Sequence, residues 1–364
     1  MSNVWGQNLK ISVFGESHGT AIGVVMENLP PGTKIDWAAV SAEMVRRAPG
    51  KSPLATPRTE KDEWEILSGY FEGHTTGAPL CAIIRNENTR PKDYMKDFMR
   101  PGHADLSAFY KFGGFTDYRG GGQFSGRLTA PLVFAGAIAK QLLQTNQIRI
   151  GARIKQIHTV IDDSICSVSD TLSASKKTFP VYDDTIGAAM QNAILTAKEN
   201  GDSVGGIIEC VSDGIQPGLL GEPMFHSLES VISAMMFSIP AVKAIEFGDG
   251  FDMVRHTGYE MNDQMMMQDG SIQFQSNHNG GILGGISNGN PLVFRIAIKP
   301  TPTISREQTT VDIQKGETIQ VRFGGRHDPC IVPRAVPVVE AGLALCILDF
   351  LHPVIINHRK EVQP

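Results

Sequence analysis

Short apolar runs of strand type alternate irregularly with a few amphipathic helical stretches along the chain. Apolar and β-branched residues bounded by glycine, proline and other turn residues predict strands. The predicted strands cover residues 10–14, 22–26, 64–67, 80–84, 148–154, 207–211, 292–298 and 318–323. Because no regular strand–helix–strand rhythm emerges, we expect an α+β fold and not a doubly wound parallel sheet.

Three helices are predicted from apolar residues that recur three or four positions apart. The first begins after Asp36, a natural N-cap, carries Val40 and Met44 on one face, and is stopped by the Ala-Pro-Gly sequence at 48–50. The second covers about 184–200, with a glycine just beyond its end. The third covers about 228–237.

A faint internal repeat joins two apolar helices. Residues 127–136 (RLTAPLVFAG) and 334–342 (RAVPVVEAG) each follow a glycine-rich polar loop and lead into a helix ending near 143 and 351. Two such copies suit a pseudo-symmetric fold of central helices flanked by sheets, with chance similarity as the alternative. Residues 248–279 have the composition of a long mobile excursion, for which a functional lid and a disordered insertion are both open interpretations.

The composition is that of an ordinary globular protein, with 364 residues of which 41% are hydrophobic and 20% charged. This length suits one large domain or two, and we expect a single domain over 1–364. The net charge of −5 argues against a general nucleic-acid binder, which needs a basic surface. An anionic ligand would instead have to meet a locally basic pocket.

The five cysteines are scattered and form no C-x-x-C pair, which argues against a disulfide framework or a zinc site. His327 and Cys330 could share a face but lack two further ligands, so we expect no metal. The N-terminus shows no basic segment followed by an apolar one, and we find no run of about twenty apolar residues. A cytoplasmic protein without a membrane segment is the expectation.

The segment GESHG at 15–19 matches G-x-S-x-G, the nucleophile elbow of serine hydrolases. An elbow needs a helix directly after it, whereas residues 20–26 (TAIGVVM) predict another strand. We therefore interpret the segment as a tight turn that projects His18, a residue type suited to proton donation near neutral pH. A turn with a surface histidine is the alternative.

Two further loops hold groups suited to anions. His103, in RPGHAD (100–105), lies near the start of a predicted helix, where the positive dipole end favours anions. In DYRGGGQFSGR (117–127), three glycines let the backbone approach a ligand, and Arg119 and Arg127 can clamp a carboxylate or phosphate. No G-K-[ST] follows, which excludes a Walker-type loop. A flexible surface loop is the alternative.

Late in the chain, the glycines of NGGILGGISNG (279–289) would allow another backbone or the edge of a cofactor to approach closely. The lysine and threonines of KPTPT (299–303) can bind a phosphate group. GGRHDPC (324–330) sets a guanidinium, an imidazole and a carboxylate side by side. Basic residues between 46 and 58 are either a solvated helix end or part of a site. With other arginines they could converge on a substrate with several negative charges: Arg46, Arg47, Lys51, Arg58, Arg100, Arg119, Arg127 and Arg326.

In this order, these segments resemble chorismate synthases. The matches run nearly end to end: GESHG (15–19), RRAPG (46–50), SGYFEGHTTGAP (68–79), RPGHAD (100–105), DYRGGG (117–122), GGILGGISNG (280–289), KPT (299–301) and GRHDPC (325–330). The resemblance implies a β-α-β sandwich, usually a homotetramer. It also implies 1,4-anti elimination of phosphate from 5-enolpyruvylshikimate 3-phosphate to give chorismate. That reaction needs reduced FMN without net redox change, and NADPH is one candidate reductant.

The resemblance also implies roles for single residues. His18 would protonate or steady the departing phosphate, supported by Ser17, and His103 would manage flavin protonation. Ser125 and Asp328 would form a relay that lets flavin N5 accept the ring proton. The substrate anions would be held by Arg47, Arg58, Arg100, Arg127 and Arg326. The flavin pocket would be lined by Gln123, Phe124, Ser125, Ala241, Gly284, Lys299, Pro300, Thr301, Pro302, Thr303 and Arg326.

The chain departs from the family pattern in one loop. Family members commonly read RGGGRSSAR, whereas this chain reads RGGGQFSGR, so Gln123, Phe124 and Gly126 differ. Gln123 removes a charge from the site, and Phe124 adds an apolar face that could pack on a flavin. Pro53 stands where an arginine is often found. Because the residues assigned the chemistry are present, we expect altered affinity and not an altered reaction.

Two other functions stay open at this stage. A flavin oxidoreductase could use the same pocket for net hydride transfer, although no G-x-G-x-x-G follows a strand. A non-catalytic anion-binding protein is the second alternative, and for it the two histidines would be superfluous.

Overall fold

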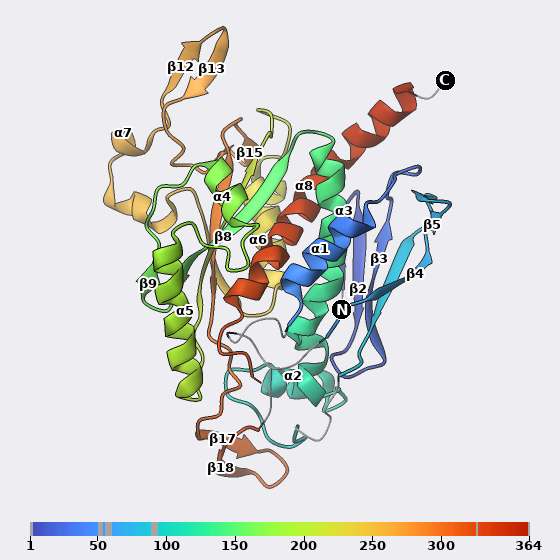
Figure 1. The fold of residues 1–364 in the computed structure, drawn as a ribbon, viewed down its shortest axis with the longest axis vertical. Coiled ribbons are helices and arrows are strands. Elements are labelled where there is room, and N and C mark those ends of the chain that lie inside the picture. Colours follow the sequence, from blue (N-terminus) through green and yellow to red (C-terminus); the bar gives the residue numbers. More distant parts are fainter. Residues whose placement is uncertain (1–2, 50–53, 55–59, 89–93, 325–326, 363–364) are drawn as a thin grey trace.

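Two five-stranded antiparallel sheets flank a layer of helices in the computed structural model (Figure 1). It describes residues 3–49, 54, 60–88, 94–324 and 327–362, with side chains as far as His352. The first sheet has the order β1-β2-β3-β7-β4, with strands Val4–Trp5, Lys10–Gly15, Ala21–Glu27, Leu80–Arg85 and Trp64–Ser68. The second has the order β11-β16-β10-β8-β9, with strands Val242–Phe247, Leu292–Ile298, Gly206–Asp213, Arg149–Ile157 and Val160–Ile161.

The helices between the sheets are α1 (Trp37–Arg47), α3 (Thr129–Gln144), α6 (Leu228–Ser238) and α8 (Val332–Val362). Other elements are α2 (Asp105–Phe112), α4 (Val168–Ala174), α5 (Asp184–Glu199), α7 (Gly258–Met261) and the short strands β5 (Tyr70–Phe71), β6 (His74–Thr75), β12 (Met265–Gln268), β13 (Ser271–Phe274), β14 (Ile282–Leu283), β15 (Ile286–Ser287), β17 (Gln308–Asp312) and β18 (Glu317–Val321). The expected α+β sandwich is confirmed.

The three predicted helices are confirmed as α1, α5 and α6. Asp36 caps α1, because its carboxylate accepts the N–H groups of Ala38 and Ala39, and Val40 and Met44 are the buried apolar face. All eight predicted strands are present within a few residues, as β2, β3, β4, β7, β8, β10, β16 and β18. Strand β11 was not predicted, since its side chains are mostly half-buried and give no clean alternation.

The same topology occurs twice, as the sequence repeat predicted. The first half has the strand order β2-β3-β7-β4, with α1 between β3 and β4 in the chain and α3 after β7. The second half has the order β8-β10-β16-β11, with α6 between β10 and β11 and α8 after β16. The β7–α3 and β16–α8 loops are therefore equivalent. They meet, since Phe98 and Asp312 form a β-bridge and the Met99 N–H donates to Val311 O.

Helix α8 corrects one expectation. Its stretch Val332–His352 contains an 18-residue window with a mean hydropathy of 1.7, which by length and composition alone could cross a membrane. In the protein 94% of that window is buried. It packs so closely on α3 that a Cβ on Gly136 would lie 2.3 Å from the Ala341 Cβ. The run is therefore the core helix of the sandwich.

Residues 248–279 form an arm with defined elements. They include α7 and the hairpin β12–β13, which stands away from the body in Figure 1. All four residues of β12 are exposed. The arm leaves β11 at Phe247, whereas the other end of β11 adjoins Lys299, whose N–H donates to Ala241 O. The arm is thus not a lid over the 299–303 loop of its own chain, and its mobility stays a prediction.

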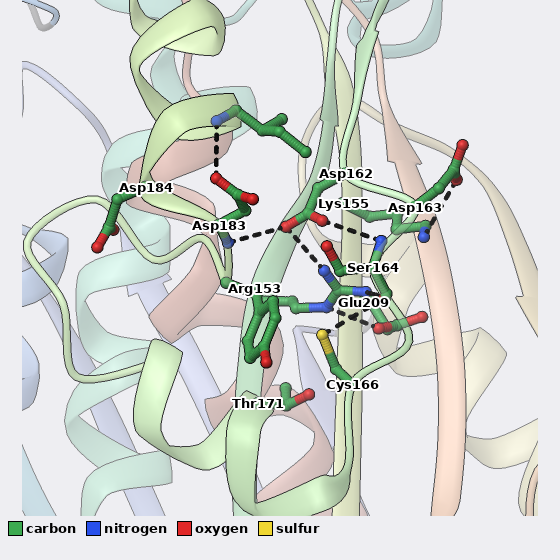
Figure 2. Close-up of polar contacts among 12 residues, drawn as sticks. Arg153, Lys155, Asp162, Asp163, Ser164, Cys166, Thr171, Asp183, Asp184 and Glu209 are labelled. Atoms are coloured by element: carbon green, nitrogen blue, oxygen red, sulfur yellow. Dashed lines mark hydrogen bonds and ion pairs between the residues drawn. The ribbon is translucent and has the colours of Figure 1, made fainter.

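A buried ladder of alternating charges ties the strands of the second sheet together. Arg153 is 1% exposed and contacts Asp162 at 3.1 Å and Glu209 at 2.9 Å, as Figure 2 shows. Glu209 lies opposite Arg153 on β8 and opposite Arg295 on β16, and Arg295 lies opposite Glu246 on β11. Burial by itself would raise the pKa of Glu209, but the Arg153 and Arg295 guanidiniums outweigh it and lower the pKa. Each charge has an opposite partner, so we assign the ladder to stability.

Candidate active site

His18 lies in the turn between β2 and β3, against the glycine loop. Because β3 follows the turn directly, the segment is a hairpin and not a hydrolase elbow, as its sequence context predicted. The Ser17 N–H donates to Gly122 O at 3.1 Å. A Cβ on Gly120 would lie 2.4 Å from the His18 ring and 2.7 Å from Ser17 Oγ. His18 is 8% exposed, so its ring is largely shielded from water.

His103 lies against the next residue of the same loop. A Cβ on Gly121 would be 2.9 Å from Cε1 and Nε2 of His103. Tyr94 links the two histidine regions: its ring meets His18 edge-on at 5.1 Å between centroids, and the Arg100 guanidinium lies 5.6 Å from its centre. The structure therefore brings together the two imidazoles that the sequence singled out.

The glycine loop has a backbone that other residues rarely adopt. Gly120, Gly121 and Gly122 have φ of 61°, 84° and 52°, in the left-handed region that favours glycine. The missing Cβ atoms of Gly120 and Gly121 leave the space that the rings of His18 and His103 occupy. Both the dihedrals and the close approach therefore require glycine at 120 and 121.

Gly120→Ala is expected to lower activity by displacing His18, and to lower the unfolding free energy. A non-glycine residue in the left-handed region costs about 1–2 kcal/mol, and the added Cβ would meet the imidazole at 2.4 Å. Gly126→Ala is the matched control, because a Cβ there meets nothing within 4 Å. Turnover and urea denaturation of both variants check this. Equal behaviour of the two variants would contradict the tight fit around His18.

Two arginines predicted to bind substrate share one buried carboxylate. Arg47 Nη1 donates to Asp62 Oδ2 at 2.7 Å, and Arg127 Nη1 donates to Asp62 Oδ1. Arg47 also donates to Gly126 O at 2.9 Å, which ties it to the glycine loop. Burial, together with Arg334 and Arg127, outweighs the pull of Asp62 and lowers the pKa of Arg47 to about 10. The two guanidiniums therefore lie together beside that loop, with Asp62 between them and Glu60 3.8 Å from Arg127.

Asp328 lies within the same charged region. Arg334 Nη1 donates to Asp328 Oδ2 at 2.8 Å, and Arg334 Nε donates to Arg47 O at 3.1 Å. The Asp328 backbone O accepts the Thr301 hydroxyl at 2.7 Å. Ser125 Oγ accepts the Arg127 N–H at 3.3 Å. Asp328 and Ser125 are therefore each joined to the arginine cluster, and the relay between them stays a prediction.

The 299–303 loop packs on the turn that holds His103. Lys299 Nζ donates to Gly102 O at 2.5 Å, and a Cβ on Gly102 would lie 3.2 Å from Pro302 Cβ. Ala241 adjoins this loop through its O, which accepts the Lys299 N–H at 3.0 Å. Gly284, which was predicted to line the same pocket, does not lie near the 299–303 loop. It precedes β16 whereas Lys299 follows it, and seven strand residues separate their ends by about 20 Å.

A cavity opens between these loops. Its walls include Tyr94, Arg100, Gly121, Gln123, Phe124 and Thr303. Phe124, which is 38% exposed, packs near Phe112 at 6.4 Å between centroids and keeps one face on the cavity. Arg58 and Arg326 lie outside the described residues, as do Lys51, Pro53 and Gly50.

Sequence reasoning missed four residues that complete the site. Asp62 pairs Arg47 with Arg127, Asp105 pairs with Arg100 and His103, Tyr94 contacts both His18 and Arg100, and Arg334 holds Asp328. The Asp105 carboxylate accepts the Arg100 N–H and does not cap α2, whose first residue it is. Arg46 is not part of the site, because Glu340 on α8 holds its guanidinium through two contacts.

Comparison with known proteins agrees with this arrangement. A family model described as chorismate synthase matches residues 9–352. Chorismate synthase from Cytophaga hutchinsonii is 44% identical over 353 residues, covering 96% of this chain and 97% of that protein. That from Methanocaldococcus jannaschii is 42% identical over 374 residues, covering 97% and 98%. A crystal structure of chorismate synthase superimposes with a TM-score of 0.76 at 28% identity, covering 98% and 97%.

Fold and matches together define an enzyme of the carbon–oxygen lyase class. Within that class, the chain belongs to the chorismate synthase family.

Proposed function

We propose that the protein eliminates phosphate from 5-enolpyruvylshikimate 3-phosphate to give chorismate, in the presence of reduced FMN and without net oxidation. The supporting observation is the convergence of His18 and His103, from segments far apart in the chain, on adjacent glycines beside a cavity. In the 1,4-anti elimination the C–O bond to phosphate breaks and phosphate leaves with the bonding pair. A ring C–H bond also breaks: its electron pair enters the new C=C bond, and its proton would leave through the proposed relay of Ser125 and Asp328 at the flavin.

The residues around the cavity fit a flavin. Phe124 offers an apolar face for a ring system, and the missing Cβ of Gly121 lets a planar group approach the backbone. The phosphate group of the cofactor would be bound at the edge of the cavity by the Lys299 ammonium, which lies beside Gly102, and by Thr303, which lines the cavity. When bound, reduced FMN supplies electron density to the reaction without being consumed. Gln123, Phe124, Ser125, Ala241 and Lys299 to Thr303 would hold it, with Arg326; Gly284 lies too far along β16 within one chain.

Side chains of the protein would donate the proton to the leaving phosphate and bind the negative charges of the substrate. His18, shielded from water, gives its proton to the departing phosphate and so lowers the charge that builds there, with Ser17 supporting the turn. Arg47, Arg100 and Arg127 attract the substrate anions, together with Arg58 and Arg326. Arg47 and Arg127 share Asp62, and their other nitrogens donate to groups of the protein, so these two arginines would act on a substrate anion through their charge. A preorganised set of cations stabilises developing negative charge without moving.

An anaerobic assay with reduced FMN tests this function against its alternatives. We expect release of one phosphate and formation of one chorismate per substrate, with the flavin reduced throughout and needed only in catalytic amount. Flavin oxidised in step with product would mark an oxidoreductase. Absence of turnover with tight anion binding would mark a non-catalytic binder. Either result contradicts the proposal.

Assembly and cellular setting are proposed on family membership alone. We expect a homotetramer in the cytoplasm, acting in aromatic amino-acid biosynthesis. Light scattering after size-exclusion chromatography measures the assembly. NADPH is proposed as a reductant, and its oxidation by the purified protein with FMN shows whether the protein reduces its own flavin.

A further inference from the structure

Asp105, the first residue of α2, holds the turn that carries His103. Its Oδ2 accepts the Arg100 N–H at 3.1 Å and Arg100 Nε at 2.7 Å, and its Oδ1 accepts Arg100 Nη2 at 2.8 Å. The same Oδ1 lies 2.7 Å from His103 Nδ1. All three side chains are at most 16% exposed. One carboxylate therefore fixes both the guanidinium and the imidazole.

These contacts decide which ring nitrogen of His103 carries a proton. Burial would raise the pKa of Asp105, but the contacts with His103 and Arg100 outweigh it and lower the pKa far below its ordinary range. The carboxylate is therefore an anion, which only accepts hydrogen bonds. An unprotonated Nδ1 would face that anion with a lone pair at 2.7 Å, which is repulsive. Nδ1 therefore bears hydrogen.

Nε2 is the ring nitrogen that remains for contact with a ligand. Arg100 Nη2 lies 3.2 Å from Nδ1 and could only donate to it, but Asp105 Oδ1 is closer, at 2.7 Å, so we take the aspartate as the partner that sets the proton on Nδ1. Lys299, from the β16–α8 loop, donates to Gly102 O. Nε2 lies beside Gly121, where a Cβ would be only 2.9 Å away, and Gly121 lines the cavity. A ligand that reaches the ring at that wall of the cavity would meet Nε2.

We propose that Asp105 is a positioning residue that keeps the proton on Nδ1 of His103, so that Nε2 alone meets a bound ligand. The proposal rests on the proposed function only in that His103 acts in the reaction. Fixing a tautomer through a carboxylate matters in other enzymes, where converting such an aspartate to asparagine keeps the geometry but lowers turnover strongly because the wrong tautomer forms.

Nitrogen-15 NMR of histidine-labelled protein, without substrate or flavin, tests the tautomer directly. The His103 signals are assigned by their loss in His103→Gln, and spectra are recorded above the pH at which the ring titrates. We expect the wild-type ring to show a protonated Nδ1 and an unprotonated Nε2. A wild-type ring with the proton on Nε2 overturns the proposal, whether or not any variant folds.

Two variants separate positioning from general damage. In Asp105→Asn the amide can donate to Nδ1, so we expect the proton to move to Nε2. Asp117→Asn is the matched control: it removes another cavity-lining carboxylate from an arginine pair, Arg119 at 2.7 Å, and should leave the His103 signals unchanged. Unchanged signals in Asp105→Asn, or the same change in Asp117→Asn, overturn the proposal.

Kinetics then connect the tautomer to turnover. We expect Asp105→Asn to lower kcat about 10²-fold or more, the usual size of a lost acid–base contribution. KM should change as well, because Asp105 also holds Arg100, which is proposed to bind the substrate anions. If wild-type protein makes no chorismate, the proposed function fails while the NMR result still stands. If it makes chorismate and Asp105→Asn turns over normally, the positioning role fails by itself.

Discussion

His103→Ala lowers turnover by about 10²–10⁴-fold, the range expected for removing one general acid–base group. The folded state should hardly change, because the described polar contacts of the ring are with Asp105 and Arg100 at the wall of the cavity. Anaerobic phosphate release with reduced FMN measures the first effect, and thermal unfolding followed by circular dichroism measures the second. The loss belongs in kcat, because an acid–base step acts in the transition state.

His74→Ala is the control for this variant. His74 is exposed on the short strand β6, where its ring contacts Glu72 O at 3.0 Å. It should keep wild-type turnover and stability. Near-normal turnover of His103→Ala, measured beside this control, would remove His103 from the mechanism and leave His18 as the remaining imidazole of the site.

The fold could be predicted from sequence where local physics decides it. Asp36 before an apolar periodic stretch predicted α1 because a carboxylate caps free N–H groups there. The repeated arginine-to-glycine segments predicted the two central helices, which the close packing of Gly136 on Ala341 explains. The arm at 248–279 could not be predicted as a hairpin, since strands that bury no face carry no alternating pattern.

The sequence predicted which loops form the site but not which charged side chains pair with one another there. Glycines and histidines identify turns and reactive groups locally, so the sequence singled out His18, His103 and the glycine loop, which lie together in the structure. Charge pairing depends on tertiary structure: Arg46 and Arg47 are neighbours, yet one joins Glu340 in the core and the other joins Asp62 at the site. Nothing in the spacing of residues along the sequence indicates that the two arginines have different partners.

Asp62→Asn is expected to lower the unfolding free energy by about 3–5 kcal/mol, as does breaking other buried ion pairs by removing one partner. The Asp62 side chain is 0% exposed, and those of Arg47 and Arg127 are each 4% exposed. Asparagine keeps the shape but leaves the two guanidiniums without their shared anion; Glu60, 3.8 Å from Arg127, is the acidic group that remains nearby. Urea denaturation measures the loss.

An exposed ion pair provides the comparison. Glu65 contacts Arg85 at 3.1 Å, but both side chains are more than half exposed, so Glu65→Gln should cost at most about 1 kcal/mol. If Asp62→Asn costs no more than Glu65→Gln, Asp62 is not the anion that stabilises the arginine pair. The binding role of Arg47 and Arg127 would then have to be argued without it.

The same residue makes stability depend on pH with a definite sign. Burial would raise the pKa of Asp62, but Arg47 and Arg127 outweigh it and lower the pKa below its ordinary 3.8. The ionised form therefore stabilises the fold above the pKa of the unfolded chain, and that contribution is lost as pH falls through the lower folded pKa. Wild-type unfolding free energy should thus decline below about pH 4, and Asp62→Asn should decline less steeply. Parallel pH curves for the two proteins would show that folding does not lower the pKa of Asp62, and the shared-anion account of the two arginines would fail with it.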